Sequence, residues 1–78
     1  MNKSTIFIGI DISKDVFDVY DPIQGHFQFT NNAKGFKSFL KILSSNHWCV
    51  MEATGCYHQQ LALFLFEKAI QVTVMNPL

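Results

Sequence analysis

Two acidic residues, Asp11 and Glu52, each close a short apolar segment of the sequence, 5–11 and 48–52. A carboxylate at the end of a buried strand is costly unless it is paired or coordinates a ligand. Open α/β sheets place their ligand crevices at the carboxyl ends of strands. If the two segments are neighbouring parallel strands, both acids lie at one edge of the sheet and form a single candidate site.

The elements that would position these acids can be read from hydrophobic periodicity. Segment 5–11 has isoleucine at every second position with Phe7 and Gly9 between, which predicts a central strand covered on both faces. Alternating apolar residues predict two further strands at 16–20 and 26–30, joined by a turn that contains Pro and Gly. These three strands are predicted to form an antiparallel meander.

Two helices are predicted to separate the remaining strands. The first starts at an asparagine cap and carries an apolar stripe formed by Phe36, Phe39, Leu40 and Leu43. The second runs from about Cys56 to Lys68, is apolar on nearly every side, and is followed by a last strand at 72–75. Right-handed crossovers would make the last two strands parallel to the first. The predicted fold is α/β, with a mixed five-stranded sheet in the order 3-2-1-4-5 and two helices.

Length and composition exclude several classes of protein. Seventy-eight residues, 49% apolar and 15% charged, predict one globular domain over residues 1–78. Six basic and six acidic residues cancel, so recognition of nucleic acid or membrane through the overall field is not expected. The longest apolar run, 61–66, is far below the roughly 20 residues that span a bilayer. Without a signal peptide, Cys49 and Cys56 favour a reducing compartment, and a cytoplasmic protein is expected.

Several motifs, in this order and spacing, resemble the amino-terminal domain of IS110-family transposases. The matching segments are Gly9-Ile10-Asp11-Ile12-Ser13-Lys14, Phe17-Asp18-Val19, Asn32 with Gly35-Phe36, Met51-Glu52-Ala53-Thr54-Gly55 with Tyr57, and Val72 with Asn76-Pro77. They extend over essentially the whole chain, and the Glu-Ala-Thr-Gly-x-Tyr segment is the most specific. The resemblance implies an RNase H-like fold similar to that of the Holliday junction resolvase RuvC.

The resemblance also implies a reaction. In that family an Asp-Glu-Asp-Asp set binds divalent metal for DNA strand cleavage and transfer, a later domain supplies a serine nucleophile, and members work with a structured RNA. Carried over by position, Asp11 is the first acid and Glu52 the second, both catalytic and both ligands of weakly bound Mg²⁺ or Mn²⁺. The other two acids and the serine domain lie outside this sequence, so an incomplete domain without cleavage activity of its own is expected. DNA and a structured RNA are the expected partners of the full-length protein.

Other residues have competing interpretations. His47, Cys49, Cys56 and His58 are zinc-type ligands, but two residues along a helix turn a side chain by about 200°, so the last pair would diverge and zinc is disfavoured. Tyr57 and His58 follow Glu52 closely and are interpreted either as core residues or as contacts to substrate. Three lysines of the first predicted helix form a solvated face or approach a nucleic-acid backbone: Lys34, Lys37 and Lys41.

The chain departs from the family pattern at one position, Ala69, and two alternative functions stay open. Ala69 stands where the family usually has a helix-ending Gly, and Asp15, Asp18 and Asp21 are predicted to be solvated. Gly9-Ile10-Asp11 also resembles the first phosphate loop of actin-like kinases and ATPases, which would make the chain part of a phosphate-binding protein. The other alternative is a non-catalytic remnant that only folds and self-associates. An apolar second helix and an uncovered last strand predict a homodimer or higher oligomer.

Overall fold

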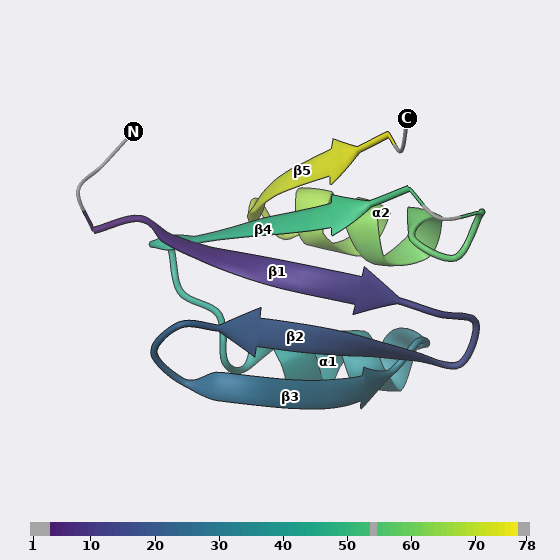
Figure 1. Ribbon diagram of the computed structural model, residues 1–78, viewed down its shortest axis with the longest axis horizontal. Coiled ribbons are helices and arrows are strands. Elements are labelled where there is room, and N and C mark those ends of the chain that lie inside the picture. The colour runs from purple at the N-terminus through teal and green to yellow at the C-terminus, as the bar shows by residue number, and fades with distance from the viewer. Residues whose placement is uncertain (1–3, 54, 77–78) are drawn as a thin grey trace.

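The computed structural model describes residues 4–53 and 55–76, and these residues form one sheet with two helices (Figure 1). The five strands lie in the order β3-β2-β1-β4-β5, which confirms the predicted order. The element bounds are β1 Ile6–Ile12, β2 Val16–Asp21, β3 Gly25–Thr30, α1 Ala33–Leu40, β4 His47–Glu52, α2 Gln59–Glu67 and β5 Gln71–Met75.

Strand directions also agree with the prediction. β1 pairs antiparallel with β2, and β2 pairs antiparallel with β3, so the first three strands form the predicted meander. β4 lies parallel to β1 and β5 lies parallel to β4, as expected when a helix crosses over between successive strands. The carboxyl ends of β1 and β4 therefore meet at the same edge of the sheet.

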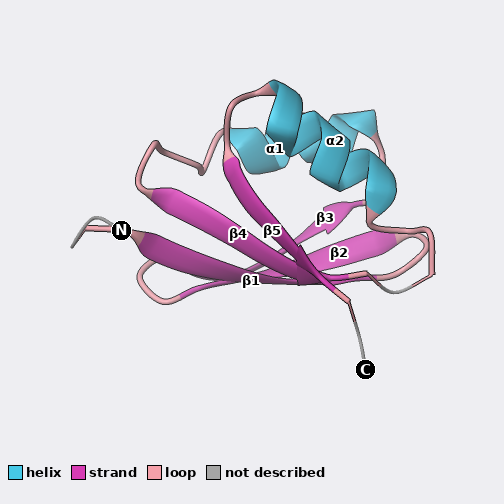
Figure 2. Cartoon of the chain, turned by 90° about the horizontal axis from the view of Figure 1, so that it is seen from above, coloured by secondary structure: helices cyan, strands magenta, loops and turns pink. Residues whose placement is uncertain are grey.

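Only one face of the sheet is covered by the described residues. Both helices lie on the same side of the sheet, and the other side is bare (Figure 2). Ile8 and Ile10 of β1 are buried under the helices, whereas Phe7, on the opposite face, keeps 43% of its surface exposed. The expectation that β1 is covered on both faces is therefore wrong for these residues, although its central position is confirmed. We refer to the face that carries Phe7 as the open face.

Helix α1 is capped and packed closely against β3. The side chain of Asn32 accepts a hydrogen bond from the N–H of Gly35 at 2.9 Å, which satisfies one unpaired donor of the first turn. A Cβ at Gly35 would overlap the carbonyl group of Thr30, so only glycine lets the helix lie this close to the strand. Phe36 is buried as predicted, but the helix ends at Leu40, and the predicted stripe residue Leu43 packs from the loop beyond it.

Helix α2 begins three residues later than predicted, at Gln59 rather than Cys56. The backbone of Gly55 is left-handed, with φ of 58°, and residues 55–58 form turns instead of helix. Leu61 and Leu65 are fully buried against the sheet. The described helices have eight and nine residues, so neither is long enough to cross a bilayer.

The end of α2 explains the departure at Ala69. The N–H of Ile70 donates to the carbonyl of Leu65 at 2.9 Å, and the N–H of Ala69 donates to that of Phe66 at 3.0 Å. This is the Schellman arrangement, which requires a left-handed residue directly after the helix. Ala69 has φ of 60°, which confirms a conformation that favours glycine.

Candidate functional site

The register of β1 and β4 brings the two predicted acids together. Ile10 pairs with Met51 at the end of the parallel ladder, and Asp11 and Glu52 are the residues that directly follow this pair, so the register places both acids at the same edge of the sheet. Neighbouring strands are about 4.8 Å apart, which lets two carboxylates approach a common ion. Both acids are exposed on the open face, because their neighbours Ile10 and Met51 are buried on the other. Asp11 was predicted to be the last residue of its strand. This is wrong by one residue, because β1 continues to Ile12 and Asp11 is the penultimate residue.

A third carboxylate, Asp18, faces Asp11 across the antiparallel β1–β2 pair. Like charges directly opposite each other destabilise a sheet unless one is compensated. Asp18 is compensated, because it accepts hydrogen bonds from His26 Nε2 at 2.8 Å and Gln28 Nε2 at 3.2 Å. The prediction that Asp18 is simply solvated is therefore wrong: it is half-buried and paired.

The acids at this edge do not form a complete metal cage. Within residues 4–53 and 55–76, no group of three or more His, Cys, Asp or Glu side chains is close enough to hold a metal ion. Asp11 and Glu52 make no side-chain hydrogen bond to another described residue, so their oxygens stay open to an external ligand. Two adjacent, exposed and uncommitted carboxylates fit part of the oxygen shell of a hard divalent cation.

Asn31 ties together the two loops that follow these acids. Its Nδ2 donates to the carbonyl of Ser13, just after β1, and to the carbonyl of Tyr57, just before α2, each at 3.0 Å. Both amide hydrogens of one side chain therefore join the loop behind Asp11 to the loop behind Glu52. Sequence pattern indicated an asparagine here only as a helix cap, so this bridging role was missed.

The remaining residues near this edge have less defined roles. Tyr57 is 42% exposed, and His58 is half-buried, with an Nδ1 that is buried and has no partner among the described residues. The N–H and the hydroxyl of Ser13 both bond to the carbonyl of Val16 at 2.9 Å. Ser13 therefore closes a turn instead of presenting donors to a phosphate, which disfavours the actin-like interpretation.

The lysines in and directly after α1 are exposed but lie away from the two acids. Lys34, Lys37 and Lys41 belong to the helical layer, whereas Asp11 and Glu52 point to the open face on the other side of the sheet. These lysines and the two acids therefore lie on opposite sides of the sheet.

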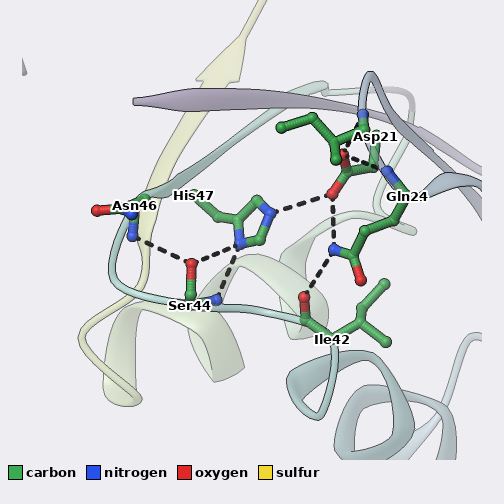
Figure 3. A network of polar contacts seen from close by, with 7 residues as sticks. Asp21, Gln24, Ile42, Ser44, Asn46 and His47 are labelled. Atoms are coloured by element: carbon green, nitrogen blue, oxygen red, sulfur yellow. Dashed lines mark hydrogen bonds and ion pairs between the residues drawn. The ribbon is translucent and has the colours of Figure 1, made fainter. Parts of the chain in front are cut away.

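The opposite end of the sheet contains a buried polar network that the sequence did not reveal (Figure 3). Asp21, predicted to be solvated, is 5% exposed, and its Oδ2 lies 3.0 Å from Nε2 of the equally buried His47. Its Oδ1 accepts the N–H groups of Ile23 at 2.7 Å and Gln24 at 3.0 Å. The side chain of Gln24 bonds both to Asp21 and to the carbonyl of Ile42. The network joins the β2–β3 turn to the loop that leads into β4.

The hydrogen bonds of this network define the state of His47. The N–H of Ser44 donates to His47 Nδ1 at 2.8 Å, so Nδ1 is an acceptor and Nε2 carries the proton that is donated to Asp21. Asp, His and Ser side chains also occur in hydrolase triads, and Ser44 Oγ is 3.2 Å from Nδ1. Because the N–H of Ser44 already occupies that nitrogen, His47 is not free to act as a base toward the hydroxyl. Hydrogen bonds occupy both ring nitrogens of His47, so neither is available to bind zinc.

Burial and hydrogen bonding shift two pKa values. Burial by itself raises the pKa of Asp21, but hydrogen bonds from the backbone and side chain of Gln24, from Ile23 and from His47 outweigh it and lower the pKa from 3.8 to about 2. Burial raises the pKa of the Cys49 thiol to about 12, so Cys49 is an inert core residue. Cys56, by contrast, is exposed.

No family model matches the chain. Its sequence is similar to the pilin gene-inverting proteins of Moraxella bovis and Moraxella lacunata, with 33% identity to each over an 84-residue alignment. The alignment covers 96% of this chain and 26% of each relative, so the chain spans about a quarter of the length of these relatives. The similarity supports a transposase or recombinase family, which is broader than the predicted IS110 family.

Proposed function

We propose that this chain is part of a DNA recombinase or transposase of the IS110 type, with an RNase H-like, RuvC-like fold. In this proposal Asp11 and Glu52 hold Mg²⁺ or Mn²⁺ for the cleavage and transfer of DNA strands. The observation that carries it is the register of β1 and β4, in which two exposed carboxylates directly follow the last residue pair of the ladder at the carboxyl edge of the sheet.

The chemistry of the two acids fits this role. A bound divalent ion would polarise a phosphate of the DNA backbone and favour attack on it. Asp11 and Glu52 supply anionic oxygens on neighbouring rigid strands, which positions them more precisely than loop residues would. Asn31 holds the loops behind both acids, so it is proposed to act as a positioning residue. Two carboxylates leave most of the shell of Mg²⁺ to water, to phosphate oxygens or to further acids, so weak binding is expected.

The similar proteins support DNA as the substrate. The relatives are named for inverting a pilin gene, which is a rearrangement of DNA. The motifs that resemble IS110 transposases include Asp11 and Glu52, and these are the acids that the structure brings to one edge. We extend the proposal to a structured RNA as a partner of the full-length protein, on the resemblance alone.

Paramagnetic Mn²⁺ tests the proposed site. Titrated into the ¹⁵N-labelled chain, it should first broaden the amide signals of residues 10–12 and 52–53, and both Asp11→Asn and Glu52→Gln should remove this broadening. Asp15→Asn, which changes an exposed acid in the β1–β2 turn, is the matched control and should leave it unchanged. Broadening centred instead on the Asp18–His26 pair, or unaffected by the two substitutions, would show that the site is assigned to the wrong residues.

A further inference from the structure

Within residues 4–53 and 55–76 the outer edge of β5 has no partner strand, and it lacks the features that usually protect such edges. β5 ends the sheet, and its sequence, Gln71-Val72-Thr73-Val74-Met75, contains no charged residue, Pro or Gly. Natural edge strands are commonly blunted by charges, prolines or bulges that prevent further pairing. An uncharged edge that contains three β-branched residues is therefore suited to accept another strand.

The backbone groups available at this edge belong to Val72 and Val74. The carbonyl of Met75 accepts the N–H of Ala53 at 2.8 Å, so the polar backbone groups of Met75 point toward β4. Because the direction of these groups alternates along a strand, those of Thr73 also point toward β4. Val72 and Val74 then point their N–H and C=O groups out of the sheet, symmetrically about Thr73.

We propose that a second copy of this chain pairs with β5, antiparallel and with a two-fold axis at Thr73. In this register Val72 of one copy lies opposite Val74 of the other, and each such pair exchanges two hydrogen bonds. The two equivalent pairs satisfy every outward group of Val72 and Val74. The result is a continuous sheet through two copies, made by one self-complementary surface as two-fold symmetry requires.

Side chains beside the edge favour the same partner. A hollow of about 420 Å³ borders the start of β5, lined by Phe66, Ala69, Ile70, Gln71 and Val72. Phe66 is 73% exposed and lies on the side of α2 away from α1, because Phe64, about 200° around the helix, contacts Phe36 of α1 at 5.5 Å between ring centroids.

The matching side chain is Val74. It is 37% exposed and lies on the same side of the sheet as the buried Met51, its neighbour in β4. In the proposed register Val74 of the second copy stands opposite Val72 and so reaches the hollow beside Phe66. Each copy therefore supplies both an apolar side chain and the hollow that receives it.

Sedimentation of the 78-residue chain tests the association without metal or DNA. We expect a species of twice 8.9 kDa at micromolar concentration, and Val74→Lys should raise its dissociation constant at least tenfold by placing a charge in the apolar contact. Ile23→Lys makes the same type of change at a side chain that is 75% exposed in the β2–β3 turn, and it should have no effect. A chain that stays monomeric, or a dimer that resists Val74→Lys but dissociates with Phe7→Lys on the open face, overturns the proposal.

Disulfide trapping tests the register. Two Thr73 residues at the two-fold axis would have Cα atoms about 4.5 Å apart, which is within the range of a disulfide. In a Cys56→Ser background, Thr73→Cys should therefore cross-link two copies under mild oxidation. Gln71→Cys is the control, because it changes the same face of the same strand. Each residue advances a strand by about 3.3 Å, so the Cα atoms of the two copies of residue 71 would be about 13 Å apart. This variant should stay uncross-linked. Equal cross-linking of both variants, or of neither, overturns the proposed pairing.

Discussion

Nε2 of His47 lies 3.0 Å from the carboxylate of Asp21, and both side chains are almost completely buried. His47 begins β4, the strand that ends in Glu52. A slip of β4 by one residue would turn Glu52 from the open face to the covered face. The buried contact at one end of the sheet therefore helps to keep the candidate site in register at the other end.

Asp21 should make the stability of the fold depend on acid pH. Its pKa is about 2 in the folded chain and 3.8 in its ordinary state, so the unfolded chain takes up the proton first as the pH falls. The stabilising contribution is complete above about pH 4 and is lost as the pH falls through about 2. We expect Asp21→Asn to lower the free energy of unfolding by about 2 kcal/mol near pH 6 and by much less near pH 2.5, as measured by urea unfolding.

Asp15→Asn is the control for this pH dependence. Asp15 is exposed in the β1–β2 turn, so its substitution should change stability little. If Asp21→Asn costs as much near pH 2.5 as near pH 6, the carboxylate of Asp21 is not the source of the effect.

Ala69→Gly should stabilise the protein. Ala69 has φ of 60°, where a Cβ is strained and glycine is not, so the free energy of unfolding should rise by about 1 kcal/mol. The matched control is Ala62→Gly within α2, where glycine should instead lower it by about 1 kcal/mol. The urea midpoints of the two variants should therefore move in opposite directions, and a destabilised Ala69→Gly would contradict the left-handed helix end.

Asn31→Leu should loosen the loops behind the two candidate metal ligands. It removes both donors that reach the carbonyls of Ser13 and Tyr57, so we expect a loss of about 1 kcal/mol in stability and roughly tenfold faster amide exchange in residues 55–58. Gln60→Leu removes an amide from an exposed position of α2 and should leave that exchange unchanged. Unaltered exchange in Asn31→Leu would show that its side chain does not hold the loop.

Hydrophobic periodicity was sufficient to predict the strand order, because alternating segments and intervening helices leave few allowed connections. The pairing of Asp11 with Glu52 followed from that order, since parallel neighbours share a carboxyl edge. The start of α2 was predicted three residues too early. The left-handed Gly55 and the turns after it delay the helix to Gln59, and hydrophobic periodicity does not show this.

The network around Asp21 and the open face could not be predicted in the same way. Asp21 and His47 are 26 residues apart, and no local pattern indicates a partner at that distance. A signal for the turn was present, because Asp followed by Pro with Gln24 three residues on is typical of a side chain that accepts nearby backbone N–H groups. Periodicity shows that Phe7 alternates with isoleucine, but it does not show whether anything covers the face to which Phe7 points.

The 78-residue chain should not cleave DNA. Two carboxylates hold a divalent ion too weakly for that ion to neutralise the negative charge that develops on a phosphate in the transition state. A plasmid-nicking assay with Mg²⁺ or Mn²⁺ should show no activity above that of the Asp11→Asn variant. Cleavage that survives both Asp11→Asn and Glu52→Gln would contradict the assignment of the site to these residues. Cleavage that both substitutions abolish would contradict the prediction that two carboxylates are too few for the reaction.

A double-mutant cycle of Mg²⁺ affinity tests most directly whether Asp11 and Glu52 hold one ion. Mg²⁺ is titrated into the ¹³C-labelled chain, into Asp11→Asn, into Glu52→Gln and into the double variant, while the side-chain carboxyl signals are followed. We predict that both signals move together with a dissociation constant on the order of millimolar, that each single substitution weakens binding at least tenfold, and that the double variant loses little more. Movement of only one signal, or fully additive losses, would show that the two carboxylates do not share an ion.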